Sequence, residues 1–511
     1  MEFKPSPLQQ TIFDWTENKS GSAIIEAVAG SGKTTTIVQA LNLIPRDLQV
    51  AFLAFNKSIA VELQSRVPEQ VQAMTLNSAG YRALRKFLSK GRKIFIKLDG
   101  RKSAGLIRQI TDEATEGYLE EISKLVALAK SHGIVPSYIR SATGLMEDTM
   151  ESWWWLIDRF DVDIRSSMVP AVVDVVREVL AAGLRERQII DFDDQLYMPV
   201  VLGARFDTYD WLFVDEAQDV SPIQRAMLRK MLKPGGRLVA VGDRSQAIYG
   251  FRGSDSESLN NIAREFNATR LPLSISYRCP KTVVMYAQKV VNHIEASDAA
   301  PEGTVMSLPV YLPADFGVDD MVVCRLTAPL ISLAYALIGR RVPVRVMGRD
   351  IGKGLVNLIE RLKPKGISGE HGLKEKLEDW KDRECQKLLT KGKEDKITGI
   401  EDKFDSIMAF IRGTGATTVP KLKEEINQMF ADDKSRKTTL CTIHKAKGLE
   451  AEKVFILDAD LMPSKWARQD WQLEQERNLE YVAITRAKQE LVFIRSGYLA
   501  YESSRKVVAA A

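Results

Sequence analysis

Two short segments of the chain contain residue types suited to phosphate chemistry. The first, residues 27–34, reads Ala-Val-Ala-Gly-Ser-Gly-Lys-Thr and fits the phosphate-loop pattern G-x-x-x-x-G-K-[ST], except that Ala27 stands at the first glycine. Small residues let backbone N–H groups approach phosphate oxygens, and a helix that follows adds positive charge at its N-terminus. Lys33 would reach the β- and γ-phosphates, and Thr34 would ligate Mg²⁺. The alternative is a glycine-rich turn with a surface lysine. The nucleotide contacts expected in this segment are Ala29, Gly30, Ser31, Gly32, Lys33, Thr34 and Thr35.

The second segment, residues 214–219, reads Val-Asp-Glu-Ala-Gln-Asp and follows an apolar run. Two adjacent carboxylates at the end of a strand are costly unless a cation lies beside them. Asp215 would hold Mg²⁺, and Glu216 would orient and deprotonate an attacking water molecule. The alternative is an acidic turn before a helix that starts near Ser221. Together the two segments predict a site for ATP and Mg²⁺, with Thr34 and Asp215 nearest the metal.

Alternating strands and helices surround both segments and would position them. Residues 22–28 and 49–55 have the character of buried strands, and residues 33–43 and 58–67 that of helices. This alternation predicts a parallel sheet that is covered on both faces. The further strands expected are residues 211–214, 237–241, 321–324, 343–346, 438–442, 453–457 and 491–494.

The same pattern predicts two α/β domains, each with a mainly helical insertion. The length of 511 residues corresponds to about three to four domains. The expected first domain comprises 1–78 and 189–272, with a helical insertion at 79–188. The expected second domain comprises 273–351 and 437–511, with a small helical insertion at 352–436.

The composition excludes several other classes of protein. The chain has 72 Lys and Arg against 67 Asp and Glu, and a net charge of +5 is too small to imply a nucleic-acid partner by itself. The four cysteines and four histidines are scattered, which argues against a disulfide framework or a zinc site. Short apolar runs and an N-terminus unlike a signal peptide predict a soluble protein of a reducing compartment, with no membrane partner.

Seven segments, in order along the chain, resemble the motifs of the UvrD/Rep group of superfamily 1 DNA helicases. They cover both expected α/β domains, and the resemblance implies that these are RecA-like. The segments are residues 6–9, 27–34, 215–219, 242–253, 276–278, 442–450 and 476–487.

The resemblance implies a role for several residues outside the two phosphate segments. Gln9 would hydrogen-bond the adenine edge, Tyr277 would stack on its face and Glu450 would contact the ribose. Gln246 would sense the γ-phosphate. Arg278 and Arg486 would act as arginine fingers on the transferring phosphoryl group, a role that is typically worth about 10³–10⁵ in rate.

The resemblance also implies a track for single-stranded DNA. Phe251 and Arg252 follow Gln246 closely, so ATP state and base contact could be linked, although Phe251 could instead pack in the core. Residues 53–57 resemble a family motif whose aromatic is shifted by one position here, in a form similar to that of the F-box DNA helicase branch. Asn77 replaces the usual histidine of another motif. The DNA contacts expected are Phe55, Asn56, Thr75, Asn77, Tyr249, Phe251, Arg252, Thr442 and His444.

Charge and aromatic residues are unevenly distributed in the expected first insertion. Residues 82–108 contain ten cations and one acid, Asp99, which is about +9 in this segment alone. The segment could contact duplex phosphates or form a solvated flexible hairpin. The run Trp153-Trp154-Trp155 cannot face one core from a helix, so we expect core packing plus a surface patch, with base stacking as the alternative.

The resemblance implies an ATP-dependent DNA helicase or translocase that moves 3′ to 5′ on single-stranded DNA. Its expected partners are single-stranded DNA and junctions between single-stranded and duplex DNA, and it would act as a monomer or weak oligomer in the cytoplasm, bound to DNA. The alternatives are a translocase that mainly strips proteins from DNA and a nucleotide-gated DNA-binding module. A helicase–nuclease subunit is not expected, because the chain ends 25 residues after Arg486.

Overall fold

The computed structural model describes residues 4–54, 56–248, 257–390, 394–431 and 435–497. The chain forms two compact units. Unit 1 consists of Met1–Ala27 and Gly32–Leu273, and unit 2 of Val28–Ser31 and Ser274–Ala511. Within the described ranges, none of the helices is both long and apolar enough to cross a bilayer.

Unit 1 contains a sheet of six parallel strands in the order β3-β2-β6-β7-β1-β8. The strands of this sheet are β1 (Ala23–Ala27), β2 (Val50–Ala54), β3 (Val71–Thr75), β6 (Tyr209–Val214), β7 (Leu232–Gly242) and β8 (Thr269–Leu273). The helices nearest to these strands in sequence are α1 (Pro7–Asn18), α2 (Lys33–Leu41), α3 (Lys57–Gln64), α4 (Leu76–Ser89), α9 (Asp194–Val201), α10 (Pro222–Met231) and α11 (Ser258–Glu265).

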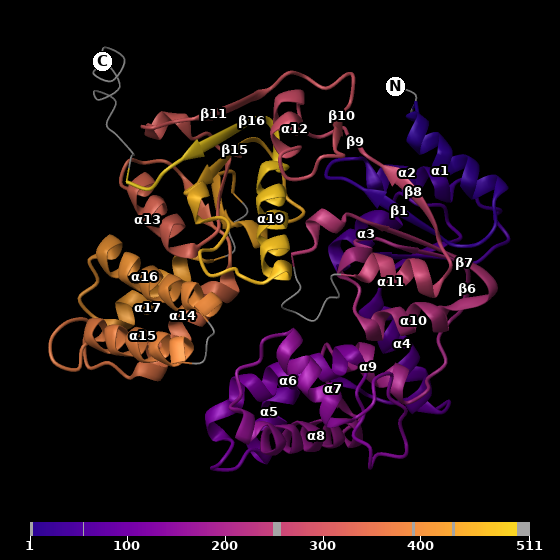
Figure 1. Ribbon diagram of the computed structural model, residues 1–511, viewed down its shortest axis with the longest axis horizontal. Coiled ribbons are helices and arrows are strands. Elements are labelled where there is room, and N and C mark those ends of the chain that lie inside the picture. Colours follow the sequence, from indigo (N-terminus) through magenta and orange to yellow (C-terminus); the bar gives the residue numbers. More distant parts are fainter. Residues whose placement is uncertain (1–3, 55, 249–256, 391–393, 432–434, 498–511) are drawn as a thin grey trace. The chain divides into compact units, whose positions relative to one another are not determined.

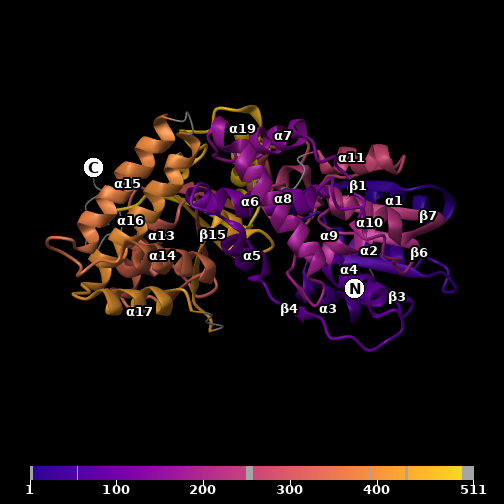
Figure 2. The ribbon, with the colours of Figure 1, turned by 90° about the horizontal axis from the view of Figure 1, so that it is seen from below.

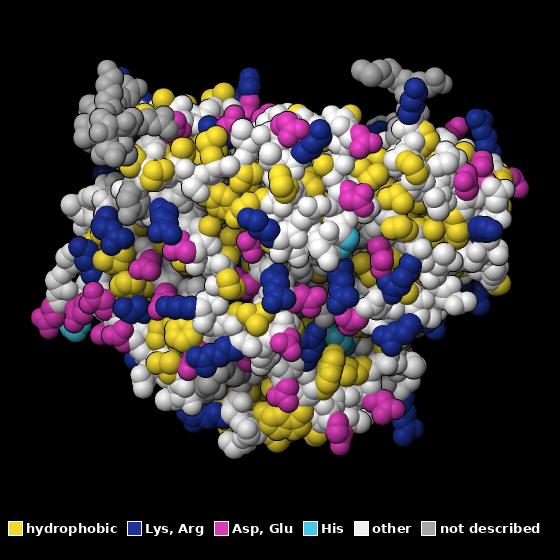
Figure 3. Space-filling model, turned by 45° about the horizontal axis from the view of Figure 1, so that its top comes forward, with side chains coloured by type: hydrophobic (Ala, Val, Ile, Leu, Met, Phe, Trp, Pro, Cys, Tyr) yellow, Lys and Arg dark blue, Asp and Glu magenta, His cyan; other side chains and the backbone are white. Residues whose placement is uncertain are grey.

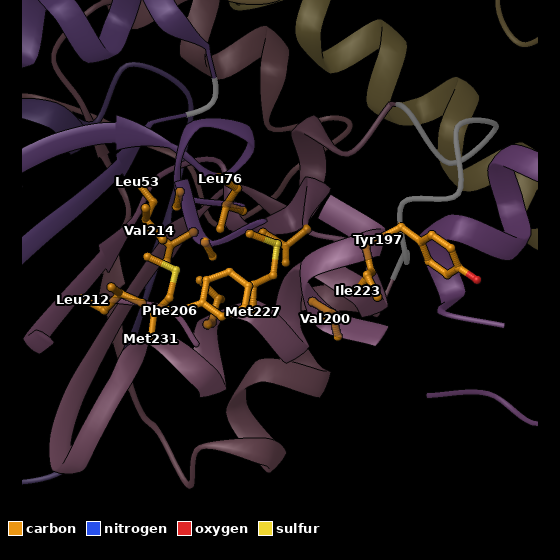
Figure 4. Packing of buried hydrophobic residues seen from close by; sticks show 14 of the residues in the cluster. Leu53, Leu76, Tyr197, Val200, Phe206, Leu212, Val214, Ile223, Met227 and Met231 are labelled. Carbon is orange, nitrogen blue, oxygen red and sulfur yellow. The ribbon is translucent and has the colours of Figure 1, made fainter. Parts of the chain in front are cut away.

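Alternate residues of the four inner strands, β2, β6, β7 and β1, face two separate apolar cores. Along β6, Leu212 and Val214 belong to one cluster, while Trp211 and Phe213 belong to the other. The first cluster also takes side chains from α4, α9 and α10, and Figure 4 shows Leu53, Tyr197 and Met227 among its members. Burial of both faces explains why these strands have nearly continuous apolar sequences.

The segment between α4 and α9 is mainly helical and has its own core. Its elements are β4 (Lys97–Leu98), α5 (Lys102–Ile110), α6 (Leu119–His132), α7 (Met150–Arg159), α8 (Val169–Arg185) and β5 (Ile189–Ile190). The core includes Ile122, Trp153 and Val176, all fully buried. Helices α5 to α8 lie together in Figures 1 and 2.

A buried group of four charges connects these helices to α9. Lys130 of α6 lies 2.8 Å from a carboxylate oxygen of Asp191 and 2.8 Å from one of Asp194. Lys102 of α5 lies 2.7 Å from Asp194 and also donates to the backbone oxygens of Gly183 and Glu186. We call Lys102, Lys130, Asp191 and Asp194 the buried charge cluster. All four side chains are at most 8% exposed, so each charge depends on the others for compensation.

Unit 2 contains a second sheet of six parallel strands, in the order β11-β16-β15-β12-β14-β13. The strands are β11 (Thr304–Ser307), β12 (Met321–Cys324), β13 (Val344–Val346), β14 (Thr438–Thr442), β15 (Ala451–Leu457) and β16 (Ala487–Ile494), and a small pair is formed by β9 (Ile275–Ser276) and β10 (Glu295–Ala296). The helices are α12 (Lys281–Ala287), α13 (Thr327–Ile338), α14 (Arg349–Leu362), α15 (Leu373–Thr390), α16 (Ile397–Thr414), α17 (Val419–Met429), α18 (Ile443–Ala446) and α19 (Asp470–Ile484).

Helices α13 to α17 and one face of this sheet share a single apolar core. Val322 and Leu440 of the sheet belong to the same cluster as Trp380, Phe410 and Ile426 of the helices. Helices α14 to α17 form the orange group in Figure 1. The predicted α/β class with two parallel sheets is therefore confirmed, while the subdivision into four domains stays a prediction.

Candidate nucleotide and DNA sites

The phosphate loop lies between β1 and α2. Gly30 has φ +71° and Gly32 has φ +74°, a backbone region that favours glycine. Gly32 caps α2 without a side-chain hydrogen bond, so the first turn presents backbone N–H groups. The Oγ of Ser31 is buried and has no hydrogen-bond partner among the described residues. A buried polar atom of this kind beside a helix N-terminus fits a phosphate ligand.

The two adjacent carboxylates follow β6, as predicted from the strand pattern. Asp215 is 9% exposed, and one of its carboxylate oxygens accepts the N–H of Glu216 at 2.9 Å. Glu216 has φ +51°, an unusual conformation for a residue with a side chain. Its Oε1 lies 3.8 Å from Nζ of Lys33, so the lysine of the phosphate loop and the expected general base face each other within unit 1.

Gln218 joins Glu216 to the segment after β7. Its side-chain amide donates to Oε2 of Glu216, and its Oε1 accepts the N–H of Asp243 at 3.1 Å. Asp243 in turn accepts from Nε2 of Gln246 at 2.6 Å and from the N–H of Ser245 at 2.9 Å. We call Glu216, Gln218, Asp243 and Gln246 the polar relay. It connects the expected general base to the expected γ-phosphate sensor.

Asp243 and Gln218 were not singled out by sequence reasoning. Burial raises the pKa of Asp243 above its ordinary value, although the nearby charge of Lys33 opposes the shift. A Cβ at Gly242 would lie 2.4 Å from Oε1 of Gln218, so only glycine leaves room for this amide. Both residues lie inside segments that resemble the family motifs, and this position in the sequence could have identified them as site residues.

Gln9, expected to read adenine, is 3% exposed and already engaged. Its Oε1 accepts the N–H of Ser6 at 2.9 Å in the cap of α1, and its Nε2 donates to Oγ1 of Thr36 at 2.9 Å. Among the described residues, the amide makes no second N–H hydrogen bond, so that N–H could donate to a base edge.

In unit 2, Glu450 lies between two cations. Nε of Arg278 is 2.6 Å from one oxygen of its carboxylate, and Nζ of Lys488 is 2.5 Å from the other. Burial works against the charged form, but the two cations outweigh it and hold the pKa of Glu450 below its ordinary value. Tyr277 is 46% exposed, as a residue that stacks on a base must be. Glu450, the expected ribose contact, is therefore paired in this structure with Arg278, one of the two expected arginine fingers.

Arg486 is 1% exposed and is held by neighbouring carbonyl groups. Its Nε donates to the backbone oxygen of Val482 at 3.0 Å, and Nη1 donates to that of Leu449 at 3.0 Å.

The residues Val28–Ser31 of the phosphate loop group with unit 2, where the Ala29 N–H donates to Oη of Tyr481 at 3.0 Å. Tyr481 is a residue that sequence reasoning missed.

Comparison with known proteins identifies the family of this chain. Residues 8–267 match the family model described as the UvrD/REP helicase N-terminal domain, and residues 359–498 match the UvrD-like helicase C-terminal domain. The chain belongs to the UvrD/REP helicase family. The resemblance inferred from the seven motifs is thus confirmed.

Curated relatives of the helicase family match at low identity. F-box DNA helicase protein 1 of Schizosaccharomyces pombe is 24% identical over 95% of this chain and 56% of its own length. F-box DNA helicase 1 of Gallus gallus is 23% identical over 97% of this chain and 49% of its own length. The ATP-dependent DNA helicase PcrA of Leuconostoc citreum is 25% identical over 54% of this chain and 38% of its own length. The chain thus spans between about two fifths and three fifths of the length of these relatives.

Several helicase-family residues expected to contact DNA already have structural roles. Asn56 caps α3 by accepting the N–H of Ile59 at 2.9 Å, and Thr75 caps α4 by accepting the N–H of Ser78 at 3.1 Å. Asn77 donates to the backbone oxygen of Phe192 at 2.9 Å. In unit 2, Thr442 is 8% exposed and His444 is half-buried. The expected contacts Phe55, Tyr249, Phe251 and Arg252 lie outside the described residues.

The cationic segment 82–108 differs in one respect from its expected form. Lys102 is 8% exposed and belongs to the buried charge cluster, so it cannot contact phosphates as the sequence suggested. The other nine cations are exposed. Elsewhere, as on the face shown in Figure 3, side chains of both signs are interspersed.

The three adjacent tryptophans divide between core and surface, as their helical spacing predicts. Trp153 is fully buried and donates to Asp148, Trp154 is half-buried and Trp155 is 46% exposed. Trp155 packs edge-on against His132 and Phe160.

Proposed function

We propose that this chain is an ATP-dependent DNA helicase or translocase that moves 3′ to 5′ on single-stranded DNA and unwinds duplex DNA. The observation that supports the proposal best is the polar relay beside Lys33. It joins Glu216, the expected general base, to Gln246, the expected γ-phosphate sensor. Gln246 lies three residues before Tyr249, which is an expected DNA contact. A change at the phosphate could thereby reach the DNA.

The phosphate loop and the residues of unit 1 would divide the chemistry of hydrolysis. The backbone N–H groups at the start of α2, Ser31 and Lys33 would bind the phosphates. Glu216 would take a proton from the attacking water, with its carboxylate oriented by Gln218. Thr34 and Asp215 would hold Mg²⁺, which would neutralise charge on the phosphate oxygens. Asp215 is buried at the end of a strand and suits an ion that binds through one or two carboxylates and substrate oxygens.

The residues of unit 2 would complete the reaction. Arg278 and Arg486 would act as arginine fingers on charge that develops at the γ-phosphate, and Tyr277 would stack on adenine. Since Arg278 is paired with Glu450 here, we expect it to leave that carboxylate when the nucleotide binds. Nucleotide binding would then draw the two RecA-like domains together, and hydrolysis would release them.

Unwinding of matched 3′-tailed and 5′-tailed duplexes, with ATP hydrolysis measured in parallel, tests the proposal. We expect hydrolysis to depend on DNA and Mg²⁺, and the 3′-tailed duplex to be unwound faster. Lys33→Ala and Glu216→Gln should abolish both activities. DNA-dependent hydrolysis that survives either substitution would refute the assignment of the site, and preference for the 5′ tail would refute the direction.

Two rival functions share the same motor residues. A translocase that mainly strips proteins from DNA would clear a protein-blocked single strand but unwind a fork poorly, so the two substrates assayed side by side separate it from a helicase. A nucleotide-gated DNA-binding module would change its DNA affinity with ATP and hydrolyse none. The facing side chains of Lys33 and Glu216 favour hydrolysis over simple gating.

A further inference from the structure

The connection between α4 and α5 presents an exposed aromatic ring among cations. We call residues 90–101 the basic loop. Phe95 in this loop is 82% exposed, more than any other large hydrophobic side chain in the described ranges. Ile94 and Leu98 are 36% and 44% exposed. Three exposed apolar side chains within five residues are a feature of binding surfaces.

The backbone of the basic loop is anchored to the rest of unit 1. Ile96 is 8% exposed and belongs to the core beneath the first sheet. The N–H of Lys97 donates to the backbone oxygen of Gln188 at 2.7 Å, and the N–H of Asp99 donates to that of Ile190 at 2.8 Å. Since Ile96 points inward, its neighbours Phe95 and Lys97 point to solvent. The ring is therefore presented by a fixed segment rather than by the flexible hairpin considered from the sequence.

The charge of the basic loop suits a polyanion. Its cations Lys90, Arg92, Lys93, Lys97 and Arg101 are all exposed. The single acid, Asp99, accepts the N–H of Arg101 at 3.0 Å and lies 3.5 Å from Nζ of Lys97. An exposed aromatic ring among cations is the combination that single-stranded nucleic acids bind, through base stacking and phosphate contacts.

The basic loop adjoins a segment that is expected to contact DNA. A Cβ at Gly100 would lie 3.8 Å from the ring of Phe192, and the backbone oxygen of Phe192 accepts from Asn77. Phe192 is itself 58% exposed. The surface around Asn77 is thus continuous with the basic loop inside unit 1.

We propose that the basic loop binds single-stranded DNA beyond Asn77, with Phe95 stacked on an unpaired base and the loop cations on phosphates. Duplex DNA exposes base faces only at its ends, so an exposed ring favours an unpaired strand over the duplex contact considered from the charge alone. The inference rests on the proposed function, because it extends the DNA track of a helicase.

Equilibrium binding of oligothymidylates, measured without nucleotide, tests the role of Phe95. One thymine is replaced by 2-aminopurine, and this probe is moved one position at a time along the strand. We expect Phe95→Ala to weaken binding of long strands at least about fivefold. Stacking on Phe95 should quench 2-aminopurine at one or two adjacent positions of the bound strand, and Phe95→Ala should restore the fluorescence of the probe there. Short strands should bind as before, and Phe95→Tyr should behave as the unmodified protein.

Matched variants decide between stacking and other causes. Leu98→Ala removes an exposed apolar side chain from the same loop and should change affinity less than twofold. Replacement of Arg92 and Lys93 by glutamine should lower the slope of log affinity against log salt by about 0.7 for each phosphate that the loop no longer neutralises.

Three results would overturn the inference. They are unchanged binding of every strand by Phe95→Ala, an equal loss in Leu98→Ala, and a loss confined to tailed duplexes, which would assign the loop to duplex DNA. Failure of the proposed function would differ, since the unmodified protein would then neither hydrolyse ATP nor unwind, whereas this binding experiment needs neither activity.

Discussion

Replacement of Gln218 by alanine should slow ATP hydrolysis without weakening ATP binding. The substitution removes the amide that donates to Glu216 and the oxygen that accepts the N–H of Asp243. Neither of these hydrogen bonds joins Gln218 to Lys33 or to the phosphate loop. Its loss should therefore affect the orientation of the general base and leave the phosphate contacts in place.

The size of the effect follows from the two hydrogen bonds. A hydrogen bond to a charged group contributes about 1.5–3 kcal/mol. If the bond to Glu216 acts fully on the transition state, kcat falls about 10- to 150-fold. Removal of the acceptor for the buried N–H of Asp243 should also lower the free energy of unfolding by about 1–3 kcal/mol. Gln218 is only 3% exposed, which places the effect toward the upper end of both ranges.

Steady-state ATP hydrolysis with saturating single-stranded DNA, together with urea unfolding, measures both effects. Gln224→Ala is a matched control, because Gln224 accepts the N–H of Ser221 in the cap of α10 and lies outside the polar relay. It should lower stability by about 0.5–2 kcal/mol and leave kcat unchanged. A rise in KM at constant kcat, or an equal loss of kcat in Gln224→Ala, would refute the positioning role of Gln218.

Four further predictions concern other parts of the chain. Lys130→Met should lower the free energy of unfolding by about 3–5 kcal/mol in urea titrations, because it leaves two buried carboxylates with one lysine. Burial works to raise the pKa of Asp191, but the charge of Lys130 and the hydrogen bond from Ser103 outweigh burial and hold the pKa below its ordinary value. The ionised carboxylate therefore stabilises the fold above about pH 4, and this stabilisation is lost as the pH falls through the lowered pKa. Urea midpoints at pH 5 and pH 3 should then differ more for the unmodified protein than for Asp191→Asn. Glu450→Gln should raise the KM for ATP yet change the free energy of unfolding by less than about 1 kcal/mol, because its ion pairs are partly exposed. Phe251→Ala, at a residue outside the described ranges, should uncouple ATP hydrolysis from translocation, and unchanged unwinding per ATP would contradict this.

The strands of the two sheets were largely predictable because burial on both faces leaves a plain apolar signal. Residues 211–214 and 321–324 fall within β6 and β12. β3, β8 and β11 were not foreseen. All three are edge strands: β3 and β8 have two buried residues each, β8 contains Pro272, and β11 has no buried residue. Weak burial therefore explains all three omissions.

The site was predictable where its residues are close in sequence and not where the fold brings them together. Two local patterns predicted that Lys33 and Glu216 share one site, and their side chains lie 3.8 Å apart, although their roles stay a prediction. The bond between Gln218 and Asp243 depends on the parallel pairing of β6 with β7, which no local pattern specifies. Lys102 could not be distinguished from its exposed neighbours, because its burial depends on Asp194, which lies 92 residues away.

The buried charge cluster makes the helical segment of unit 1 difficult to remove or exchange. Deletion of α5 to α8 would remove Lys102 and Lys130 and leave Asp191 and Asp194 uncompensated beside the first sheet. A homologous segment could replace it only if it brought two cations to the same positions. Both aspartates lie outside α5 to α8, so a chimeric protein should exchange these helices only together with Asp191 and Asp194.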